Sequence, residues 1–265
     1  MELRGKRVLI TGASRGIGES LAHAFAGAGA TVALVARTKD AIRTLADELG
    51  GTAHPADLSD PTQVADLVGQ VEQQAGPVDV LVNNAGIGLL GKPLTEMSPT
   101  DWDKTMGTNL RGPYLMIRAL APLMIAAQSG HIVNISSLAG CGVFAGLVSY
   151  SASKAALSHF TAGLRADLRG LTIGTTLVEL GPIPTDMLAQ TDDYEPTAAA
   201  FRRFYRLRLM VDVPREKVAD EVVEAVQKGR RHVRIPKRLT LTAALSEAPR
   251  RVTEVLLGGV PHQVK

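Results

Sequence analysis

The order of segments along the chain predicts an α/β protein whose core is a doubly wound parallel sheet. Short apolar runs alternate with longer segments whose apolar residues recur at helical spacing, and a glycine-rich turn joins the first run to the first helical segment. No composition shift or Pro- and Ser-rich linker divides the 265 residues. Strands that alternate with helices through right-handed crossovers give a parallel sheet covered on both faces. We therefore expect residues 1–265 to form one domain.

In the first part of the chain, apolar and β-branched runs predict strands, and amphipathic segments predict helices. Strands are expected at residues 8–10, 31–36, 52–56 and 78–82, and helices at residues 17–28, 40–49 and 63–75. The helix at 40–49 shows the reasoning, because Ile42, Leu45, Ala46 and Leu49 follow one helix face. The helix at 63–75 begins after a turn at Pro61.

The second part continues the alternation with longer helices. Helices are expected at residues 98–127, 149–169 and 216–228, and strands at 131–136, 172–178 and 232–236. Residues 239–257 are a candidate for further helix, within a C-terminal extension at about residues 237–265.

Composition excludes several classes of protein. Hydrophobic residues make up 45% and charged residues 21% of the chain, which allows a large core and argues against disorder. The net charge of +3 is too small for a dedicated nucleic-acid binder. Arginines gather at residues 202–208 and 229–234, which we interpret as solvated surface, with an anionic ligand or a membrane surface as the alternative.

Cysteine usage and hydropathy indicate a cytoplasmic protein without an integral membrane segment. Cys141 is the one cysteine, so no intramolecular disulfide can form. The six histidines show no metal-ligand spacing, and the N-terminus lacks the apolar core of a signal peptide. The longest apolar stretch, residues 114–127, contains Arg118 and Pro122 and is too short to span a bilayer.

The turn at residues 11–18 has the spacing T-G-x-x-x-G-x-G and lies between the first strand and the first helix. Glycines allow a tight turn and let the backbone approach a pyrophosphate, and the helix N-terminus supplies N–H groups and a positive dipole end. The turn therefore predicts a Rossmann-type dinucleotide site, formed by Gly12, Ser14, Arg15, Gly16, Ile17 and Gly18.

The end of the second strand indicates which dinucleotide is bound. Rossmann proteins that use NAD carry a carboxylate there to hold the ribose 2′-hydroxyl. This chain has Arg37 instead, and Arg15 lies within the glycine turn. Guanidinium groups form charge-assisted bonds with phosphate, so we predict NADP(H) in preference to NAD(H), with two surface arginines as the alternative reading.

Tyr150 and Lys154 are four residues apart in the helix predicted at 149–169. Side chains at i and i+4 lie on one helix face, where a cation lowers the pKa of a neighbouring phenol. This predicts that Tyr150 exchanges a proton near neutral pH. The pair alone is weak support, since tyrosine and lysine share many solvated helix faces.

These motifs, taken in order over residues 7–187, closely resemble those of the short-chain dehydrogenases/reductases. The resemblance implies that Asp57 and Leu58 hold adenine and that Asn84, Ala85 and Gly86 line the cofactor ribose. It further implies contacts from Ile183 and Thr185 to the nicotinamide, and a catalytic tetrad. The tetrad comprises Asn109, Ser137, Tyr150 and Lys154.

The resemblance also implies a division of roles within the tetrad. Ser137 and Tyr150 hydrogen-bond the substrate oxygen, Tyr150 is the general acid or base, and Lys154 holds the nicotinamide ribose. Asn109 holds a water that links Lys154 to solvent, or else serves only as a helix-kink residue. Strand alternation points Ser136 away from Ser137, and spacing in the family favours Ser137.

One segment departs from the shared motifs, and a second segment follows the last of them. Leu180 stands where the family usually has proline, which puts the order of the loop without cofactor in doubt. Residues 187–213 hold four of the ten aromatic residues among several arginines. Their two readings are an ordinary amphipathic helix and a mobile lid over an apolar substrate.

The sequence as a whole predicts an NADP(H)-dependent enzyme that interconverts a carbonyl and a secondary alcohol. We expect reduction of an apolar or lipid-like ketone, and the family resemblance implies a homodimer or homotetramer formed through the two long helices. The alternatives are a non-catalytic NADP-binding scaffold or redox sensor, and a protein that binds nucleic acid or a membrane surface. The intact tetrad argues against the first, and the low net charge against nucleic acid.

Overall fold

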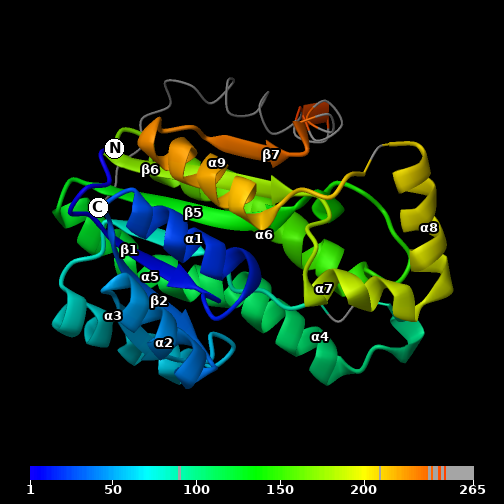
Figure 1. Ribbon diagram of the computed structural model, residues 1–265, viewed down its shortest axis with the longest axis horizontal. Helices are drawn as coiled ribbons and strands as arrows, with labels where there is room; N and C mark the ends of the chain where they lie inside the picture. Colours follow the sequence, from blue (N-terminus) through cyan, green and yellow to red (C-terminus); the bar gives the residue numbers. More distant parts are fainter. Residues whose placement is uncertain (89–90, 209, 238–239, 241–243, 246–247, 249–265) are drawn as a thin grey trace.

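Seven parallel strands form one sheet in the order β3-β2-β1-β4-β5-β6-β7 in the computed structural model, which describes residues 1–88, 91–208, 210–237, 240, 244–245 and 248 (Figure 1). The strands are β1 (Arg7–Thr11), β2 (Thr31–Ala36), β3 (Thr52–Pro55), β4 (Val80–Asn83), β5 (Gly130–Ser137), β6 (Ile173–Leu180) and β7 (His232–Ile235). The inner strands are buried on both faces, which explains why they read as continuous apolar runs.

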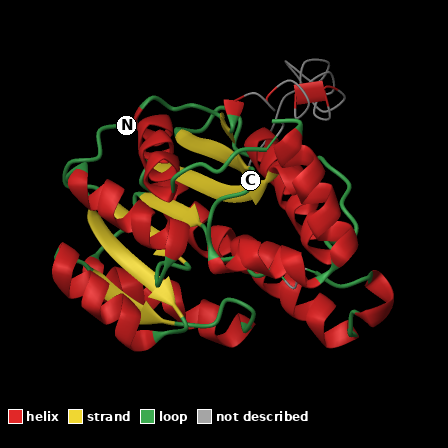
Figure 2. Ribbon diagram, turned by 45° about the vertical axis from the view of Figure 1, so that its right-hand side comes forward, coloured by secondary structure: helices red, strands yellow, loops and turns green. Residues whose placement is uncertain are grey.

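Helices cover both faces of the sheet (Figure 2). One face packs against α1 (Gly16–Gly27), α2 (Lys39–Leu49) and α9 (Arg215–Gln227), and the other against α3 (Pro61–Ala75), α5 (Gly112–Ala126) and α6 (Val148–Asp167). The two apolar cores contain Phe25 and Val222 on the first side and Leu67 and Met116 on the second. The predicted parallel sheet with helices on both faces is therefore confirmed.

The predicted elements are present, and most of their ends lie within two residues of the expected positions. The helix expected at 98–127 needs a correction, since it is α4 (Pro99–Met106), a π-helical segment (Gly107–Arg111) and α5 in succession. Asn109, inside the π segment, binds the backbone of Ile87 through its side chain. A π segment is a wide turn that often marks a functional position.

A chain of buried polar side chains joins the centre of the sheet to α6. Asn83 donates to Asn134 Oδ1 over 2.9 Å, and Asn134 donates to Thr161 Oγ1 over 2.9 Å. Buried polar groups need such partners, and a chain of these bonds favours one packing arrangement over others, although Asn83 Oδ1 is buried without a partner among the described residues. These bonds fix β4, β5 and α6 relative to one another, and Ser137 of β5 and Tyr150 and Lys154 of α6 belong to the site.

The carboxyl ends of the strands form the edge where the site lies. The strand order reverses between β1 and β4, which is the position where doubly wound sheets bind ligands. The 187–213 segment, with α7 (Asp186–Ala189), a 3-10 turn (Gln190–Asp193) and α8 (Glu195–Arg206), stands beyond the ends of β5 and β6 (Figure 1). Short 3-10 turns also occur at Leu94–Glu96 and Leu138–Gly140. The predicted C-terminal extension and its candidate helix lie almost wholly outside the described residues.

Candidate functional site

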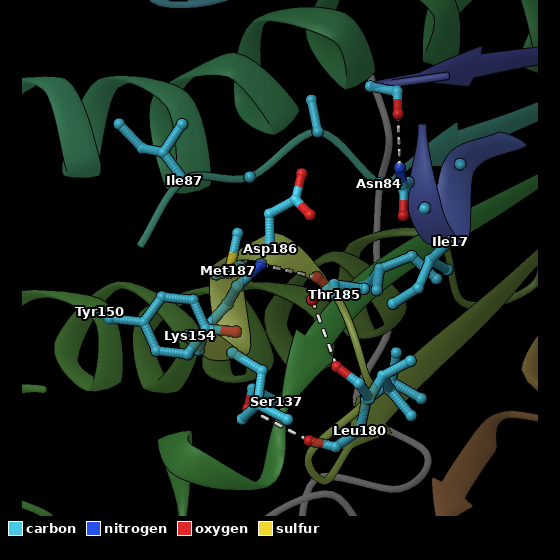
Figure 3. Close-up of a pocket in the computed structure, with 18 of the residues that line it drawn as sticks. Ile17, Asn84, Ile87, Ser137, Tyr150, Lys154, Leu180, Thr185, Asp186 and Met187 are labelled. Carbon is cyan, nitrogen blue, oxygen red and sulfur yellow. Dashed lines mark hydrogen bonds between the residues drawn. The ribbon is translucent and has the colours of Figure 1, made fainter. Parts of the chain in front are cut away.

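One cavity of about 950 Å³ runs along the carboxyl edge of the sheet from Arg37 at the end of β2 to Phe204 on α8. Figure 3 shows its middle part, with Tyr150 and Lys154 on one side and Thr185 and Asp186 on the other. Every site residue expected from the sequence lines this cavity except Asn109, which is buried behind it. The fold therefore collects residues that are up to about 170 positions apart in the chain.

The glycine turn is shaped by close approach as well as by backbone dihedral angles. Gly12 and Gly16 have φ values of +66° and +63°, a region that side chains disfavour. A Cβ atom on Gly12 would lie 2.7 Å from Cα of Ala85, and a Cβ atom on Gly18 would collide with the carbonyl oxygen of Gly12. No side chain fits at Gly12 or Gly18, so the backbone itself forms the floor of the cavity.

Two polar side chains hold the glycine turn against the loop after β4. Thr11 Oγ1 accepts from the backbone N–H groups of Asn84 and Ala85, each over 3.0 Å. Asn84 Nδ2 donates to the carbonyl oxygens of Thr11 and Gly12 over 2.9 and 3.2 Å. Figure 3 marks one hydrogen bond of Asn84. No side chain caps the N-terminus of α1, so its N–H groups suit the pyrophosphate of a dinucleotide.

Arginines line the cofactor end of the cavity, and no carboxylate follows β2. Arg37 is exposed at the end of that strand. Arg15 Nη1 lies 2.6 Å from Asp186 Oδ2, an ion pair between two exposed side chains. No sequence pattern indicates this pair, because its members are 171 positions apart. The two guanidinium groups fit a ribose that carries a phosphate.

Asp57 and Leu58 lie in the turn after β3, where they line the cavity. Asp57 Oδ1 accepts from the backbone N–H of Ser59 over 2.9 Å and from its hydroxyl over 2.8 Å. These bonds fix the turn, and Leu58 is buried beside it. The pair therefore occupies the end of the groove where the resemblance places adenine.

Ser136 and Ser137 at the end of β5 point in opposite directions, as strand alternation predicts. Ser136 Oγ donates to the carbonyl of Lys154 over 3.0 Å and lies 2.9 Å from Ser158 Oγ, within the packing of α6. Ser137 Oγ faces the cavity, where it donates to the carbonyl of Leu180 over 3.1 Å (Figure 3). Of the two hydroxyl groups, Ser137 is the one that a ligand can reach.

Tyr150 and Lys154 lie one turn apart on α6, and Lys154 Nζ is 5.7 Å from the centre of the Tyr150 ring. Lys154 Nζ also donates to the carbonyl of Ile135 over 2.9 Å. Burial lowers the pKa of Lys154 to about 8. A pKa of about 8 still leaves most of this amine charged at neutral pH.

The expected effect of Lys154 on Tyr150 needs a correction. The pKa of Tyr150 is raised above its usual value, because desolvation by burial outweighs the lowering by the nearby Ser137 hydroxyl. The prediction of a lowered phenol pKa was wrong for this structure, since it considered the charged neighbour and not the low-dielectric surroundings. Tyr150 is therefore a protonated hydrogen-bond donor at neutral pH.

Asn109 acts behind the cavity wall. Its Oδ1 accepts from the backbone N–H of Ile87 over 2.8 Å, and its Nδ2 donates to the Ile87 carbonyl over 2.9 Å and to Ser153 Oγ over 3.0 Å. A Cβ atom on Gly86 would lie 3.3 Å from Lys154 Nζ and 3.5 Å from Asn109 Oδ1, so both groups lie beside the space that Gly86 leaves free. Asn109 thus ties the loop after β4 to α6.

The loop after β6 brings Ile183 and Thr185 to the cavity opposite the glycine turn. Ile183 is buried, and its carbonyl accepts from Thr185 Oγ1 over 3.2 Å. The Leu180 carbonyl accepts from the Ser137 hydroxyl, and the Gly181 N–H donates to Ile235 O over 2.7 Å. The loop that lacks the usual proline is thus anchored to both neighbouring strands of the sheet.

The far end of the cavity is apolar. Phe201 and Phe204 of α8 face Phe144, which lies in the loop between Ser137 and Tyr150. Phe144 was absent from the residues expected at the site, although an aromatic residue in an otherwise small-residue loop was a usable signal. In the described part of the chain, no cluster of three or more acidic, histidine or cysteine side chains could hold a metal ion. No helix there is long and apolar enough to cross a membrane.

The chain is similar to known proteins in sequence and in structure. The sequence model described as short chain dehydrogenase matches residues 6–196. A short chain dehydrogenase of Pseudocercospora fijiensis is 38% identical over 222 residues, which cover 82% of this chain and 72% of the relative.

Two further similar proteins carry names that mention a nicotinamide cofactor. An NADP-dependent 3-hydroxy acid dehydrogenase of Shigella flexneri is 36% identical over 176 residues, 66% of this chain and 71% of the relative. A crystal structure of a metagenomic short-chain oxidoreductase in complex with NADP is 35% identical, with a TM-score of 0.71, and covers 88% of this chain and 98% of the other.

Proposed function

The chain belongs to the short-chain dehydrogenase family, and from this membership we propose that it interconverts a carbonyl and a secondary alcohol with NADP(H). The observation that carries the proposal is the convergence of Ser137, Tyr150 and Lys154 in the middle of the cavity. On one side of these three residues lies the part of the cavity that suits a dinucleotide, and on the other side lies its apolar end. A hydride donor and a carbonyl can therefore meet beside the proton donor, Tyr150.

The three side chains have complementary tasks in ketone reduction. The nicotinamide, when bound, supplies the hydride. The Ser137 hydroxyl and the Tyr150 phenol donate hydrogen bonds to the carbonyl oxygen as negative charge grows there. Tyr150 then gives its proton to that oxygen, and the Lys154 ammonium stabilises the phenolate left behind. The raised pKa of Tyr150 keeps the phenol protonated before the step.

We propose that Asn109 is a positioning residue, and that it holds a water through which protons pass between Lys154 and solvent. The notion of a water between Asn109 and Lys154 is supported by the approach of both groups to one point beside Gly86, where a Cβ atom would lie 3.3 Å from Lys154 Nζ and 3.5 Å from Asn109 Oδ1. The purely structural alternative is supported by the hydrogen bonds of Asn109 to Ile87 and Ser153 and by its place in the π segment. Both roles depend on the same side-chain orientation.

NADP(H) is the preferred cofactor in this proposal, with NAD(H) as the weaker alternative. Arg37 and Arg15 line the end of the cavity where the adenosine ribose would lie, and β2 ends without a carboxylate. NADP stands in the names of two proteins similar to this chain. Tighter binding of NADH than of NADPH in a fluorescence titration would contradict the preference.

We propose reduction of an apolar or lipid-like ketone as the reaction. The 187–213 segment would serve as a lid, which is supported by its position over the strand ends and by the lining from Met187, Phe201 and Phe204. A hydroxy acid is the second candidate substrate, because one relative is named a 3-hydroxy acid dehydrogenase. A non-catalytic scaffold or redox sensor is the alternative function.

Replacing Tyr150 with Phe tests the proposal most directly. The variant loses the proton donor, so turnover of any reduced ketone should fall by roughly 10²- to 10⁴-fold, while NADPH binding and melting temperature stay near wild type. NADPH oxidation is followed against a panel of ketones, aldehydes, quinones and 3-oxoacyl thioesters. Tyr114→Phe, which removes an exposed phenol away from the cavity, is the matched control. Unchanged turnover in Tyr150→Phe would remove Tyr150 from the mechanism.

Three further expectations belong with this proposal. Residues 1–265 are taken as one domain, with the lid at 187–213 and an extension at 237–265. The enzyme is taken to act as a homo-oligomer on a small molecule, without nucleic acid. A cytoplasmic location accords with the single cysteine and can be checked by cell fractionation.

A further inference from the structure

Three phenylalanines from two separate parts of the chain meet at the apolar end of the cavity. Phe144 lies in the loop before α6, and Phe201 and Phe204 are one turn apart on α8. The centre of the Phe144 ring is 5.6 Å from that of Phe201 and 5.3 Å from that of Phe204. These spacings lie in the range of favourable aromatic contacts. We refer to the three residues as the phenylalanine cluster.

The phenylalanine cluster is open to a ligand. All three side chains line the cavity, and each is only half-buried. Phe144 is tilted by 57° and 58° against its two neighbours, so the cluster presents both ring faces and ring edges. A planar aromatic group can add to such an arrangement by offset stacking or by an edge-to-face contact.

The surrounding backbone holds the phenylalanine cluster in place. A Cβ atom on Gly142 would lie 2.8 Å from Cε2 of Phe144, so the loop closes tightly on this ring. Thr197 Oγ1 on α8 donates to the carbonyl of Ala145 over 2.7 Å, which fastens the helix to the Phe144 loop. The three rings therefore meet in a defined arrangement and not by chance contact of two loose segments.

The charges on the cavity wall argue against an acidic substrate at this end. Among the described lining residues, the cationic side chains are Arg15, Arg37, Lys154 and Arg215. Arg15 pairs with Asp186, Arg215 pairs with Glu19, and Lys154 lies beside Tyr150. Arg37 follows β2, at the other end of the cavity from Phe204. A carboxylate beside the phenylalanine cluster would lose hydration without gaining an unpaired cation from these groups.

We propose that the phenylalanine cluster is a subsite for an aryl group, and that the preferred substrate is a neutral ketone with an aromatic ring near its carbonyl. This inference rests on the proposed function and names its substrate class. It separates this chain from a relative named for 3-hydroxy acids. The aryl ring would lie among Phe144, Phe201 and Phe204 while the carbonyl oxygen meets Tyr150 and Ser137.

The test compares three substrates of the full-length chain with NADPH: a phenyl-substituted methyl ketone, its cyclohexyl counterpart, and a 3-oxo acid. We expect kcat/KM to be highest for the phenyl ketone and lowest for the acid. Phe204→Leu and Phe144→Leu keep an apolar side chain but remove a ring. Each should lower kcat/KM for the phenyl ketone by roughly 3- to 10-fold and for the cyclohexyl ketone by less than about 2-fold.

Two more variants sharpen the result. Gly142→Ala displaces the Phe144 ring without removing it, so the preference for phenyl over cyclohexyl should shrink although all three rings remain. Phe160→Leu is the matched control, because Phe160 is also half-buried and in a ring pair, 6.5 Å from Tyr114, but does not line the cavity. Its preference should equal that of the wild type.

A binding measurement separates this inference from the proposed function. Saturation-transfer NMR on the full chain with NADP⁺ should show contact to the phenyl protons, and weaker signals with Phe204→Leu. If no carbonyl compound is reduced, the proposed function fails while the NMR result still decides the subsite. Any of three results would overturn the aryl subsite. The first is equal kcat/KM for the phenyl and cyclohexyl ketones, and the second is an equal loss of kcat/KM for both ketones in the variants. The third is a preference for the 3-oxo acid. Should Phe204→Leu fail to fold, Phe144→Leu and Gly142→Ala carry the same comparison.

Discussion

Adjacent serines at the end of β5 differ in role because a strand turns successive side chains to opposite faces. Ser136 is used within the protein, where it bonds the backbone of α6, and Ser137 is turned to the cavity. In this structure the Ser137 proton is directed to the Leu180 carbonyl. The hydroxyl must therefore rotate away from Leu180 when it donates to a substrate oxygen, a motion that costs little for a single torsion.

Residues outside the site also have consequences that can be measured, and His131 is the clearest. It is 3% exposed on β5, and its Nε2 lies 2.8 Å from Thr176 Oγ1. Burial lowers the pKa of His131 to about 4. An unfolded histidine has a pKa of about 6.5, so below that pH the unfolded chain takes up the proton first.

We predict that His131 makes the protein less stable as the pH falls from about 6.5 towards 4. Its contribution is fully present above about 6.5, and between pH ~7 and ~5 the linkage amounts to about 2 kcal/mol. The His131→Gln variant should therefore lose about 2 kcal/mol less than wild type over this interval in urea unfolding. His159→Gln, at an exposed position, should behave as wild type. Equal pH slopes for His131→Gln and wild type would refute the assignment.

At the scale of elements, α6 and the π segment before α5 carry the polar part of the site. Tyr150 and Lys154 lie on the first two turns of α6, and Asn109 in the π segment bonds Ser153 between them. Gly112 lies against the loop after β3, where a Cβ atom would be 3.1 Å from the Leu58 carbonyl. The wide turn thus lets one long helical stretch contact both Leu58 after β3 and Ser153 on α6.

The ion pair between Arg15 and Asp186 links two elements across the cofactor groove, from the glycine turn to the start of α7. If Arg15 holds a 2′-phosphate, Asp186 competes with that phosphate for the guanidinium group. We predict that Asp186→Asn binds NADPH more tightly by roughly 1.5- to 5-fold and leaves NADH binding unchanged, because an exposed ion pair contributes about 0.2–1 kcal/mol.

Fluorescence titration of each cofactor measures this effect. Asp192→Asn, which changes another exposed aspartate nearby, should leave both affinities at the wild-type values. Equal tightening for NADPH and NADH in Asp186→Asn would mean that Arg15 does not act on the 2′-phosphate.

At the scale of the whole molecule, α5 and α6 leave apolar surface uncovered. Tyr114 on α5 is 45% exposed and meets Phe160 of α6 edge-on, with ring centres 6.5 Å apart. Exposed aromatic surface of this kind often marks a contact with another chain. We infer that a second copy covers this surface, in line with the homo-oligomer expected from the sequence.

Light scattering at micromolar concentration should therefore give a mass of at least twice the 28.0 kDa of one chain. Tyr114→Asp places a charge in the inferred contact and should shift the mass towards the monomer. Val143→Asp is the control, since Val143 is 99% exposed but lies elsewhere. A wild-type chain that scatters as a monomer would contradict the inference.

Local patterns determined most of the architecture and of the polar site. Apolar periodicity identified the strands and helices, because it depends on which residues face the core within a few positions. The glycine turn and the tyrosine–lysine spacing could be recognised in the sequence for the same reason, since each is complete within eight residues. Even the choice of Ser137 over Ser136 needed only the alternation of a strand.

Tertiary structure decided what depends on distant groups and on burial. The pKa of Tyr150 rises because the packed protein desolvates the phenol, whereas the sequence displayed only the neighbouring cation. The pairing of Arg15 with Asp186 and the meeting of Phe144 with Phe201 and Phe204 join segments far apart in the chain. Periodicity carries no information about such contacts, because they arise only when the sheet brings the loops at its carboxyl edge together.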